Sequence, residues 1–337
     1  MTDQELKQYC GAVTVPDREI MDAARRRQAE LAKPPGSLGK LEDYSIRLAG
    51  ITGQVRPHIE KCRVLVLAGS RTMCGAGFLC AKSALLSGAG LVFWALPASM
   101  QPAFAAALPE AITLPLPETP EGEISRGAFG LLMDFCALRK PSLAVVGPGM
   151  GASPLLGEFL AQCPLPVIAD ADALNFLARR EDWATRWPKN RPSIFTPHPG
   201  EMARLLKTEI TPDEAGRLRQ AEALCRVTGG VSVLKGSGTL VCAETDGAPE
   251  TWQNTTGGPA LAKAGSGDVL SGVIAGLWAQ LGAAEGFDAS SALKAALCGV
   301  YLHGLAGDLA ALKRTDYGVL AGDTAAYIPQ AFLEILE

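Results

Sequence analysis

Residues 143–172 read LAVVGPGMGASPLLGEFLAQCPLPVIADAD and contain one complete unit of the fold. The unit begins with a fully apolar run, Leu143–Val146, turns at glycines and continues through a helical stretch. It ends in a second apolar run, Val167–Ala169, which acidic residues follow. Apolar strands that alternate with helices are typical of a parallel sheet covered on both faces. This stretch therefore predicts an α/β fold.

The same rhythm extends in both directions from this unit, beginning at residue 62. We predict further strands where short apolar runs end in glycine or proline turns: Arg63–Ala68, Leu91–Leu96, Ser193–Thr196, Val231–Lys235 and Thr239–Ala243. The last two runs flank Gly236-Ser237-Gly238, which predicts a hairpin instead of a helical crossover. After Gly267 we expect the chain to be helical almost to its end.

Residues 1–60 have a different composition. They are rich in charge and in helix formers, as in DREIMDAARRRQAELAK (17–33) and LGKLEDYSIRLAGIT (38–52), and Pro34-Pro35-Gly36 separates the two segments. This pattern predicts two helices around a rigid turn. We therefore expect a helical extension at 1–60 and an α/β domain at 61–337.

Composition and charge favour a small-molecule enzyme of the cytoplasm. Hydrophobic residues make up 48% of the 337 residues, charged residues 20%, and the net charge of -4 leaves no basic stripe for nucleic acid. Ser83–Pro109 is uncharged and long enough to span a bilayer, but glycines and prolines divide it. We expect buried helix, strand and helix there, and no membrane association. The polar first residues lack the apolar core of a signal peptide.

Metal-binding patterns are not visible in the sequence. The nine cysteines are dispersed without a C-x-x-C pair and there are three histidines, so we expect reduced thiols and no zinc site.

His198 is the histidine best suited to ligand contact, because prolines on both sides restrict its backbone and Glu201 is near. His58 and His303 have no such setting and are interpreted as structural.

Polar and glycine-rich clusters follow five of the predicted strands. They are Gly69-Ser70-Arg71, Gly147–Gly151, Asp170-Ala171-Asp172, Thr196–Glu201 and Lys235–Thr239. In an open parallel sheet, ligands bind at the carboxyl ends of the strands. A turn that needs glycine explains any one cluster, whereas five at one edge predict a binding site.

Ala264-Gly265-Ser266-Gly267-Asp268 is the strongest single motif, and an apolar helix, VLSGVIAGLWAQL, follows it. Glycines let backbone N–H groups approach a phosphate, and a helix N-terminus adds roughly half a positive charge. We therefore predict an anion hole at Gly265, Ser266 and Gly267, suited to phosphoryl transfer. Asp268 is the candidate base for an attacking hydroxyl. Alternatively, Asp268 only stabilises the helix start, by about 1 kcal/mol.

Two other nucleotide-binding motifs match less well. A Walker A loop requires glycine before its lysine, and Ala81 precedes Lys82. Gly147-x-Gly149-x-x-Ala152, with Asp170 about twenty residues later, resembles a dinucleotide-binding fingerprint and leaves a nicotinamide-dependent dehydrogenase open. However, Pro148 stiffens that turn, and this interpretation gives the motif at 264–268 no role.

At these motifs the chain resembles the ADP/ATP-dependent NAD(P)H-hydrate dehydratases. The resemblance spans about residues 62–337 and rests on GSRTMCGAG (69–77), VVGPGMG (145–151), IADADALN (168–175), FTPHPGE (195–201), LKGSGT (234–239) and NTTGGPALAKAGSGDVLSG (254–272). It implies a ribokinase-like three-layer α/β/α sandwich with a mostly parallel sheet. It also implies dehydration of NAD(P)H hydrate (NADHX or NADPHX) with ADP or ATP and Mg²⁺, by phosphorylation of the ring hydroxyl and loss of phosphate.

The resemblance also implies roles for individual residues. Ala76, Gly149, His198 and Asp268 would face the hydrated dinucleotide, with Asp268 as the catalytic base. The adenine nucleotide would be held by Lys235, Gly236, Ser237, Gly238, Thr239 and Gly267. The magnesium ligands stay open. One departure is Lys263, which adds a charge near the anion hole where the family often has threonine.

The N-terminal segment resembles a different family. LAKPPGSLGKLEDYSIRLAGITGQ (31–54) is similar to the start of nicotinate-nucleotide–dimethylbenzimidazole phosphoribosyltransferases, whose remaining sequence is absent here. We interpret the segment as a helical appendage that packs on the main domain or on another subunit of a homo-oligomer. A specialised activity tied to cobamides or nicotinate nucleotides is the alternative.

Two further functions stay open at this point. The first is a ribokinase-like kinase for a vitamin-related nucleoside or alcohol, which would leave a stable phosphoester instead of releasing phosphate. The second is a non-catalytic nucleotide sensor, which has no need of a base such as Asp268.

Overall fold

The computed structural model describes residues 17–30, 40–55, 62–211 and 213–336. They belong to two compact units. Helices α2 (Arg18–Glu30) and α3 (Lys40–Thr52) lie in one unit, and the chain from the first strand onward forms the other.

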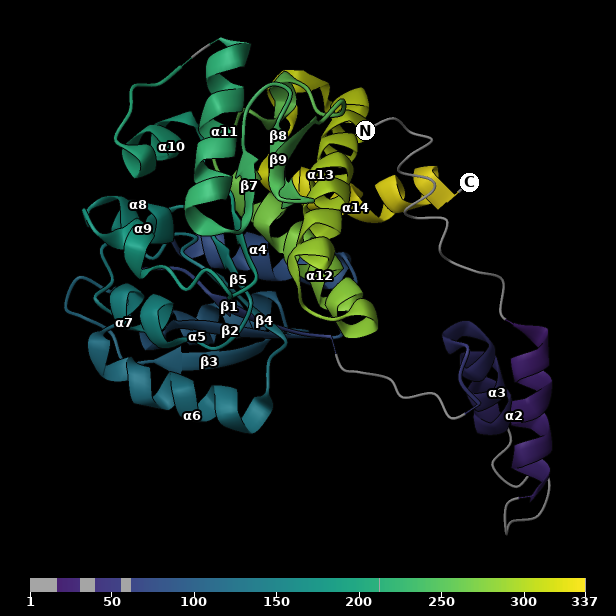
Figure 1. Ribbon diagram of the computed structural model, residues 1–337. Coiled ribbons are helices and arrows are strands. Elements are labelled where there is room, and N and C mark those ends of the chain that lie inside the picture. Colours follow the sequence, from purple (N-terminus) through teal and green to yellow (C-terminus); the bar gives the residue numbers. More distant parts are fainter. Residues whose placement is uncertain (1–16, 31–39, 56–61, 212, 337) are drawn as a thin grey trace. The chain divides into compact units, whose positions relative to one another are not determined.

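The larger unit is built on a nine-stranded sheet in the order β3-β2-β1-β4-β5-β6-β7-β8-β9 (Figure 1). All pairs from β3 to β7 are parallel, and the two pairs that involve β8 are antiparallel. The strands are β1 (Arg63–Leu67), β2 (Leu91–Pro97), β3 (Ile112–Leu116), β4 (Leu143–Val146), β5 (Val167–Ala169), β6 (Ser193–Phe195), β7 (Val231–Leu234), β8 (Leu240–Thr245) and β9 (Ala248–Gln253). The predicted α/β fold and the predicted β7–β8 hairpin are confirmed.

The two strands that the sequence did not predict, β3 and β9, are the edge strands of the sheet. Pro115 interrupts the apolar run of β3, and β9 has the mixed sequence APETWQ with an alternately exposed face. An edge strand is covered less than a central one, so its residues need not be apolar. The inner strands β1, β2 and β4–β7 are predominantly apolar and almost fully buried, whereas β3 and β9 are not.

Helices cover both faces of the sheet because alternate residues of each strand point to opposite sides. Leu65 and Leu67 of β1 join the core beneath α6–α11, and Val64 and Val66 join the core beneath α4, α12 and α13. The helices are α4 (Cys74–Leu86), η1 (Ala98–Met100), α5 (Gln101–Ala107), η2 (Arg126–Ala128), α6 (Phe129–Arg139), α7 (Leu155–Gln162), α8 (Asp172–Ala178), α9 (Trp183–Arg186), α10 (Pro199–Leu206), α11 (Glu214–Thr228), η3 (Pro259–Leu261), α12 (Ser266–Glu285), α13 (Ala289–Gly318) and α14 (Ala321–Leu336). The chain after Gly267 is helical, as predicted.

The uncharged stretch Ser83–Pro109 forms the end of α4, the buried strand β2, η1 and α5, as expected. Among the described helices, α13 alone is long and apolar enough to cross a membrane by length and composition. However, 72% of its most apolar window is buried inside the fold, which is typical of a core helix. Among the described residues, Cys74, Cys80, Cys136, Cys163, Cys225 and Cys242 form no disulfide bond.

Helices α4 and α12 pack closely because α12 has glycines on the contact face. A Cβ atom at position 272 would lie 2.3 Å from the Cys80 carbonyl oxygen and 2.8 Å from Ser83 Cβ. At position 276 it would lie 2.6 Å from the Ala84 carbonyl oxygen. These contacts set the position of the first turn of α12, where the glycine motif lies.

We therefore expect Gly272→Ala to lower the free energy of unfolding by about 1–3 kcal/mol, the range for an overpacked core. Gly130→Ala is the matched control, because a Cβ at this exposed position of α6 would contact nothing within 4 Å. The control should be neutral or more stable by up to about 1 kcal/mol. Urea unfolding of both variants checks this, and equal stability would contradict the close packing.

The N-terminal helices pair through a small apolar cluster. Ala24 of α2 and Ile46 and Ala49 of α3 are buried, and Gln28 Nε2 donates to Ser45 Oγ (2.6 Å). The two predicted helices are present, and the predicted turn at Pro34-Pro35-Gly36 lies outside the described residues.

Candidate functional site

A cavity of about 570 Å³ opens beside the carboxyl ends of β6 and β7. It brings together seven of the residues that the sequence predicted for the site: His198, Lys235, Gly236, Ser237, Thr239, Ser266 and Gly267. They come from three segments, namely the start of α10, the turn between β7 and β8, and the first turn of α12. The volume is in the range of ligand-binding clefts.

The other predicted residues, Ala76, Gly149, Gly238, Gly265 and Asp268, do not line this cavity. Ala76 and Gly149 lie against each other, since a Cβ at 149 would stand 2.8 Å from that of Ala76. Gly265 packs on α4, with Leu79 Cδ1 2.7 Å from the place of a Cβ. His198 thus shares a cavity with the residues predicted for the nucleotide, whereas Ala76 and Gly149 lie apart from it.

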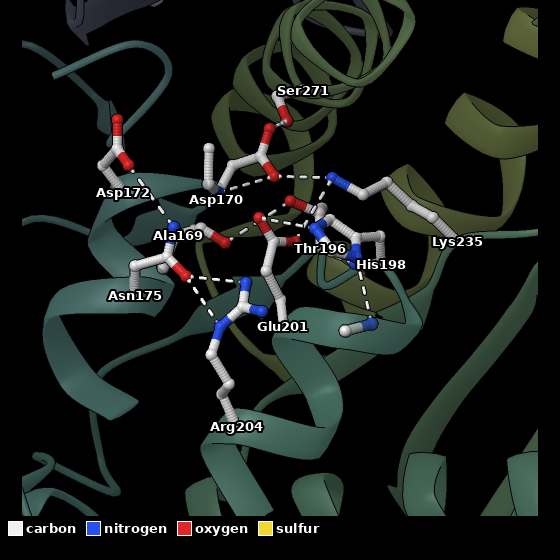
Figure 2. Close-up of polar contacts among 12 residues, drawn as sticks. Ala169, Asp170, Asp172, Asn175, Thr196, His198, Glu201, Arg204, Lys235 and Ser271 are labelled. Carbon is white, nitrogen blue, oxygen red and sulfur yellow. Dashed lines mark hydrogen bonds and ion pairs between the residues drawn. The ribbon is translucent and has the colours of Figure 1, made fainter. Parts of the chain in front are cut away.

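Lys235 and Asp170 form a shielded ion pair at the centre of the site (Figure 2). The Lys235 Nζ–Asp170 Oδ1 distance is 2.8 Å, and the other carboxylate oxygen of Asp170 accepts from Ser271 Oγ of α12 (2.7 Å). Burial lowers the pKa of Lys235, but the negative charges of Asp170 and Glu201 have a larger combined effect. The pKa of Lys235 is therefore raised. Asp170 thereby links the β5 and β7 strand ends to α12.

Glu201 fixes the start of α10 and faces the same lysine. Its Oε2 accepts from the His198 amide (2.8 Å) and lies 3.9 Å from Lys235 Nζ. Burial raises the pKa of Glu201, although Lys235 counteracts the shift. His198 Nδ1 accepts a hydrogen bond from the Gly200 amide (3.0 Å). Burial lowers the pKa of His198, and the positive charge of Lys235 lowers it further. The histidine is therefore neutral at physiological pH.

The first turn of α12 presents backbone donors. Gly265, at φ +91°, is the residue before the helix, and the Ser266 amide donates to the Lys263 carbonyl (3.2 Å). Within the described residues, the amides of Gly267 and Asp268 have no hydrogen-bond partner. A Cβ at Gly267 would lie 3.1 Å from Lys235 Nζ, so the ammonium group lies close to Gly267. This arrangement suits an anion.

Asp268 does not cap helix α12. Gly265 occupies the cap position, and no hydrogen bond to the Asp268 carboxylate is found in the described part of the chain. Burial raises the pKa of Asp268 to about 7, and the nearby Asp170 charge adds to the shift while Lys235 opposes it. A carboxyl group with a pKa near neutrality is matched to general base catalysis.

His303 corrects one sequence interpretation. It lies in the middle of α13, yet it lines the cavity, and its Nε2 is 3.2 Å from Ser266 Oγ. Burial lowers the pKa of His303 to about 4, so the ring is neutral where it contacts the Ser266 hydroxyl at the start of α12. A lone histidine in an apolar helix carries no sequence signal of this contact.

Asp170 does not have the place that a dinucleotide fingerprint requires. Its carboxylate binds Lys235 and Ser271, leaving it unavailable for a ribose. Gly147 is explained by packing, because a Cβ there would lie 2.0 Å from the Asp170 carbonyl oxygen. The dehydrogenase interpretation is therefore wrong.

Sequence comparison identifies relatives of this unit. The profile of the NAD(P)H-hydrate dehydratase family matches residues 64–330. A bifunctional NAD(P)H-hydrate repair enzyme of Moorella thermoacetica is 40% identical over 279 residues, covering 82% of this chain and 50% of the relative. An ADP-dependent (S)-NAD(P)H-hydrate dehydratase of Xanthomonas campestris is 37% identical over 276 residues, covering 80% of this chain and 88% of the relative. The chain thus spans about half the length of the bifunctional relatives.

Solved structures show the same fold. An ADP/ATP-dependent NAD(P)H-hydrate dehydratase of Bacillus subtilis, co-crystallised with ATP and Mg²⁺ and soaked with CoA, superposes with a TM-score of 0.64 at 28% identity. The superposition covers 83% of this chain and 94% of that one. Ribokinase of Giardia lamblia, at 14% identity and a TM-score of 0.52 over 82% of this chain and 99% of that one, shares the fold alone. The predicted ribokinase-like sandwich is confirmed.

The N-terminal resemblance is confirmed too, because a phosphoribosyltransferase family profile matches residues 13–83. This match is short, and it overlaps the dehydratase profile over 64–83. The dehydratase profile extends over most of the chain and contains every segment of the site. The chain therefore belongs to the NAD(P)H-hydrate dehydratase family.

Proposed function

We propose that this protein dehydrates NAD(P)H hydrate to NAD(P)H with ADP or ATP as co-substrate. The observation that carries the proposal is the raised pKa of Asp268 in the first turn of α12, beside free amide donors and Lys235. A base, an anion hole and a cation in one place suit phosphoryl transfer from a nucleotide to a hydroxyl group. The names of the relatives support this substrate.

The chemistry then assigns a task to each group. Asp268 takes the proton of the ring hydroxyl as the oxygen attacks the terminal phosphorus, and AMP leaves from ADP or ADP from ATP. The amides of Gly267 and Asp268 stabilise charge on the transferring group. Phosphate then departs with its C–O bond electrons while the ring loses a proton, which restores the double bond.

We assign the two subsites as the family resemblance implies. The hydrated dinucleotide contacts Ala76, Gly149, His198 and Asp268, and the adenine nucleotide contacts the turn Lys235–Thr239 and Gly267. The shared cavity supports the nucleotide set. Because His198 lines the same cavity, it lies where the two substrates meet.

Mg²⁺ is the cofactor that the Bacillus subtilis co-crystal suggests. Among the described residues there is no cluster of three or more side chains that would hold a metal ion alone. Asp170 and Glu201 nevertheless face one another across Lys235, and magnesium is commonly held by one or two carboxylates together with substrate phosphates. In this structure, however, both carboxylates share the Lys235 ammonium group, and neither lines the cavity, so these residues do not fit a magnesium site.

The direct test is an assay with NADHX or NADPHX, ADP or ATP, and Mg²⁺. We expect the absorbance of reduced nicotinamide to return in proportion to the inorganic phosphate that is released. A stable phosphoester without phosphate release would indicate the small-molecule kinase instead. Nucleotide binding without turnover of either kind would indicate a sensor.

We also propose that residues 1–60 form a separate domain that is not needed for chemistry, in a cytoplasmic homo-oligomer. The separate apolar cluster of α2 and α3 supports this division. Deletion of residues 1–58 should leave turnover within about tenfold, which is below ~1.4 kcal/mol of barrier. A folded truncation without activity in the same assay would contradict this prediction, whereas a change in assembly alone would not.

A further inference from the structure

Arg217 of α11 holds the turn between β7 and β8 from outside the cavity. Its Nη1 donates to the Ser237 carbonyl (2.8 Å) and its Nη2 to the Gly238 carbonyl (2.9 Å). A guanidinium group is planar and rigid, so one side chain fixes two consecutive peptide planes. Arg217 is half-buried and is not among the residues that line the cavity.

The two neighbouring carbonyl groups of the turn are engaged as well. The Gly236 carbonyl accepts from Thr239 Oγ1 (3.1 Å), and the Thr239 carbonyl accepts from the Asn254 amide (2.8 Å). All four carbonyl groups from Gly236 to Thr239 therefore have donors within the protein.

The amide groups of this turn have the opposite environment. Across the described ranges of the chain, no hydrogen-bond partner is found for the amides of Gly236, Ser237, Gly238 and Thr239. Three of these residues line the cavity. A carbonyl and the following N–H point in opposite directions across a planar peptide, so the Arg217 contacts aim the amides of Gly238 and Thr239 away from the guanidinium. Successive amides of this kind form an anion-binding nest.

The turn needs such a restraint because its backbone is permissive. Gly236 and Gly238 adopt φ values of +149° and +59°, which glycine reaches as readily as negative values. Without donors for the Ser237 and Gly238 carbonyls, these peptides are free to rotate. A rotated peptide would present a carbonyl oxygen, which repels phosphate, in place of an amide donor.

We propose that Arg217 is a positioning residue for the nucleotide phosphates, acting through the peptide planes of Ser237-Gly238 and Gly238-Thr239. The inference rests on the proposed function, because it assumes that an adenine nucleotide occupies this cavity. The proposal gives Arg217 and Lys235 different roles. The lysine contacts the phosphates directly, whereas the arginine fixes the orientation of the backbone donors.

Calorimetry with ADP and with adenosine on the full chain tests the proposal. Arg217→Met should weaken ADP binding about 10- to 50-fold and leave adenosine binding within threefold. In the dehydration assay the KM for nucleotide should rise similarly, while kcat at saturating nucleotide and the KM for the hydrate stay within threefold. Arg217→Lys keeps the charge but cannot bridge both carbonyls, so it should remain at least fivefold weaker than wild type.

Arg219→Met is the matched control, since Arg219 is exposed on the same helix two residues away. It should bind ADP as the wild type does. Wild-type affinity in Arg217→Met, or full rescue by Arg217→Lys, overturns the positioning role while the proposed function stands. A wild-type protein that binds no ADP or ATP contradicts both. If Arg217→Met does not fold, Arg217→Lys decides alone.

Discussion

Replacement of Asp268 by asparagine is expected to lower turnover by about 10²–10⁴, the usual contribution of a general base. Asparagine has nearly the same size but cannot accept the hydroxyl proton. Nucleotide affinity should be retained within a few-fold, because the amide donors of Gly267 and residue 268 remain. Steady-state kinetics and calorimetry on the same preparation give both numbers. Near-normal turnover in a folded variant would show that the base lies elsewhere.

The pH dependence sharpens this expectation. Asp268 is active as the carboxylate, so the wild-type rate should rise with pH through about 7 and then level off. The folded pKa lies above the ~3.9 of an exposed aspartate, so the folded state binds more protons between these values. Stability from this group is therefore present at low pH and lost as the pH rises toward 7.

Asparagine does not ionise, so the Asp268→Asn variant does not lose stability as the pH rises toward 7. The difference in Tm between the variant and the wild type should therefore favour the variant more at pH 8 than at pH 5. A residue that only stabilised the helix start would behave in the opposite way, with lower stability and unchanged turnover. Rate and melting temperature thus separate the two interpretations of Asp268.

The sequence predicted those parts of the molecule in which a single physical requirement decides the residue type. Central strands must be apolar on both faces, so Leu143–Val146 and Val167–Ala169 were recognisable, whereas the partly exposed edge strands β3 and β9 were not. The glycine turns at the strand ends were also recognisable, because a tight turn after a strand often requires glycine. Their convergence followed from the rule for parallel sheets and not from any pairwise signal.

The side chains that connect these turns were mostly beyond sequence reasoning. Asp170 and Lys235 are 65 residues apart, and nothing local shows that their charges meet at 2.8 Å. Arg217 and His303 lie within helices. An arginine in a helix is normally exposed at the surface, and a histidine in an apolar helix is normally part of the core. Their contacts with Ser237, Gly238 and Ser266 form only in the folded chain.

Replacement of Lys235 by methionine should have the largest effect on stability. It leaves Asp170, which is 1% exposed, and Glu201, which is 4% exposed, without their shared cation. Breaking a buried pair in this way costs about 3–5 kcal/mol. Arg226→Met breaks an exposed Arg–Glu pair of 3.5 Å and should cost less than about 1 kcal/mol. Urea unfolding at pH 7 compares the two.

The pH dependence of the Lys235→Met defect identifies its cause. Burial raises the pKa of Glu201, and without the ammonium group Lys235 no longer counteracts this shift. The stability contribution of Glu201 is then present at low pH and lost as the pH rises, so the defect should be smaller at pH 5 than at pH 8. A second substitution, Asp170→Asn, should recover part of the loss.

Lys235 also lowers the pKa of Asp268, so its removal should move the rising limb of the pH–rate profile above pH 7. Binding of ADP or ATP should weaken by about 1.5–3 kcal/mol, the range for charge-assisted hydrogen bonds. Unchanged nucleotide affinity with lost affinity for the hydrate would instead reverse the assignment of the two subsites. An unshifted pH profile would show that Lys235 and Asp268 are not electrostatically coupled, so that burial and the neighbouring carboxylates set the pKa of Asp268.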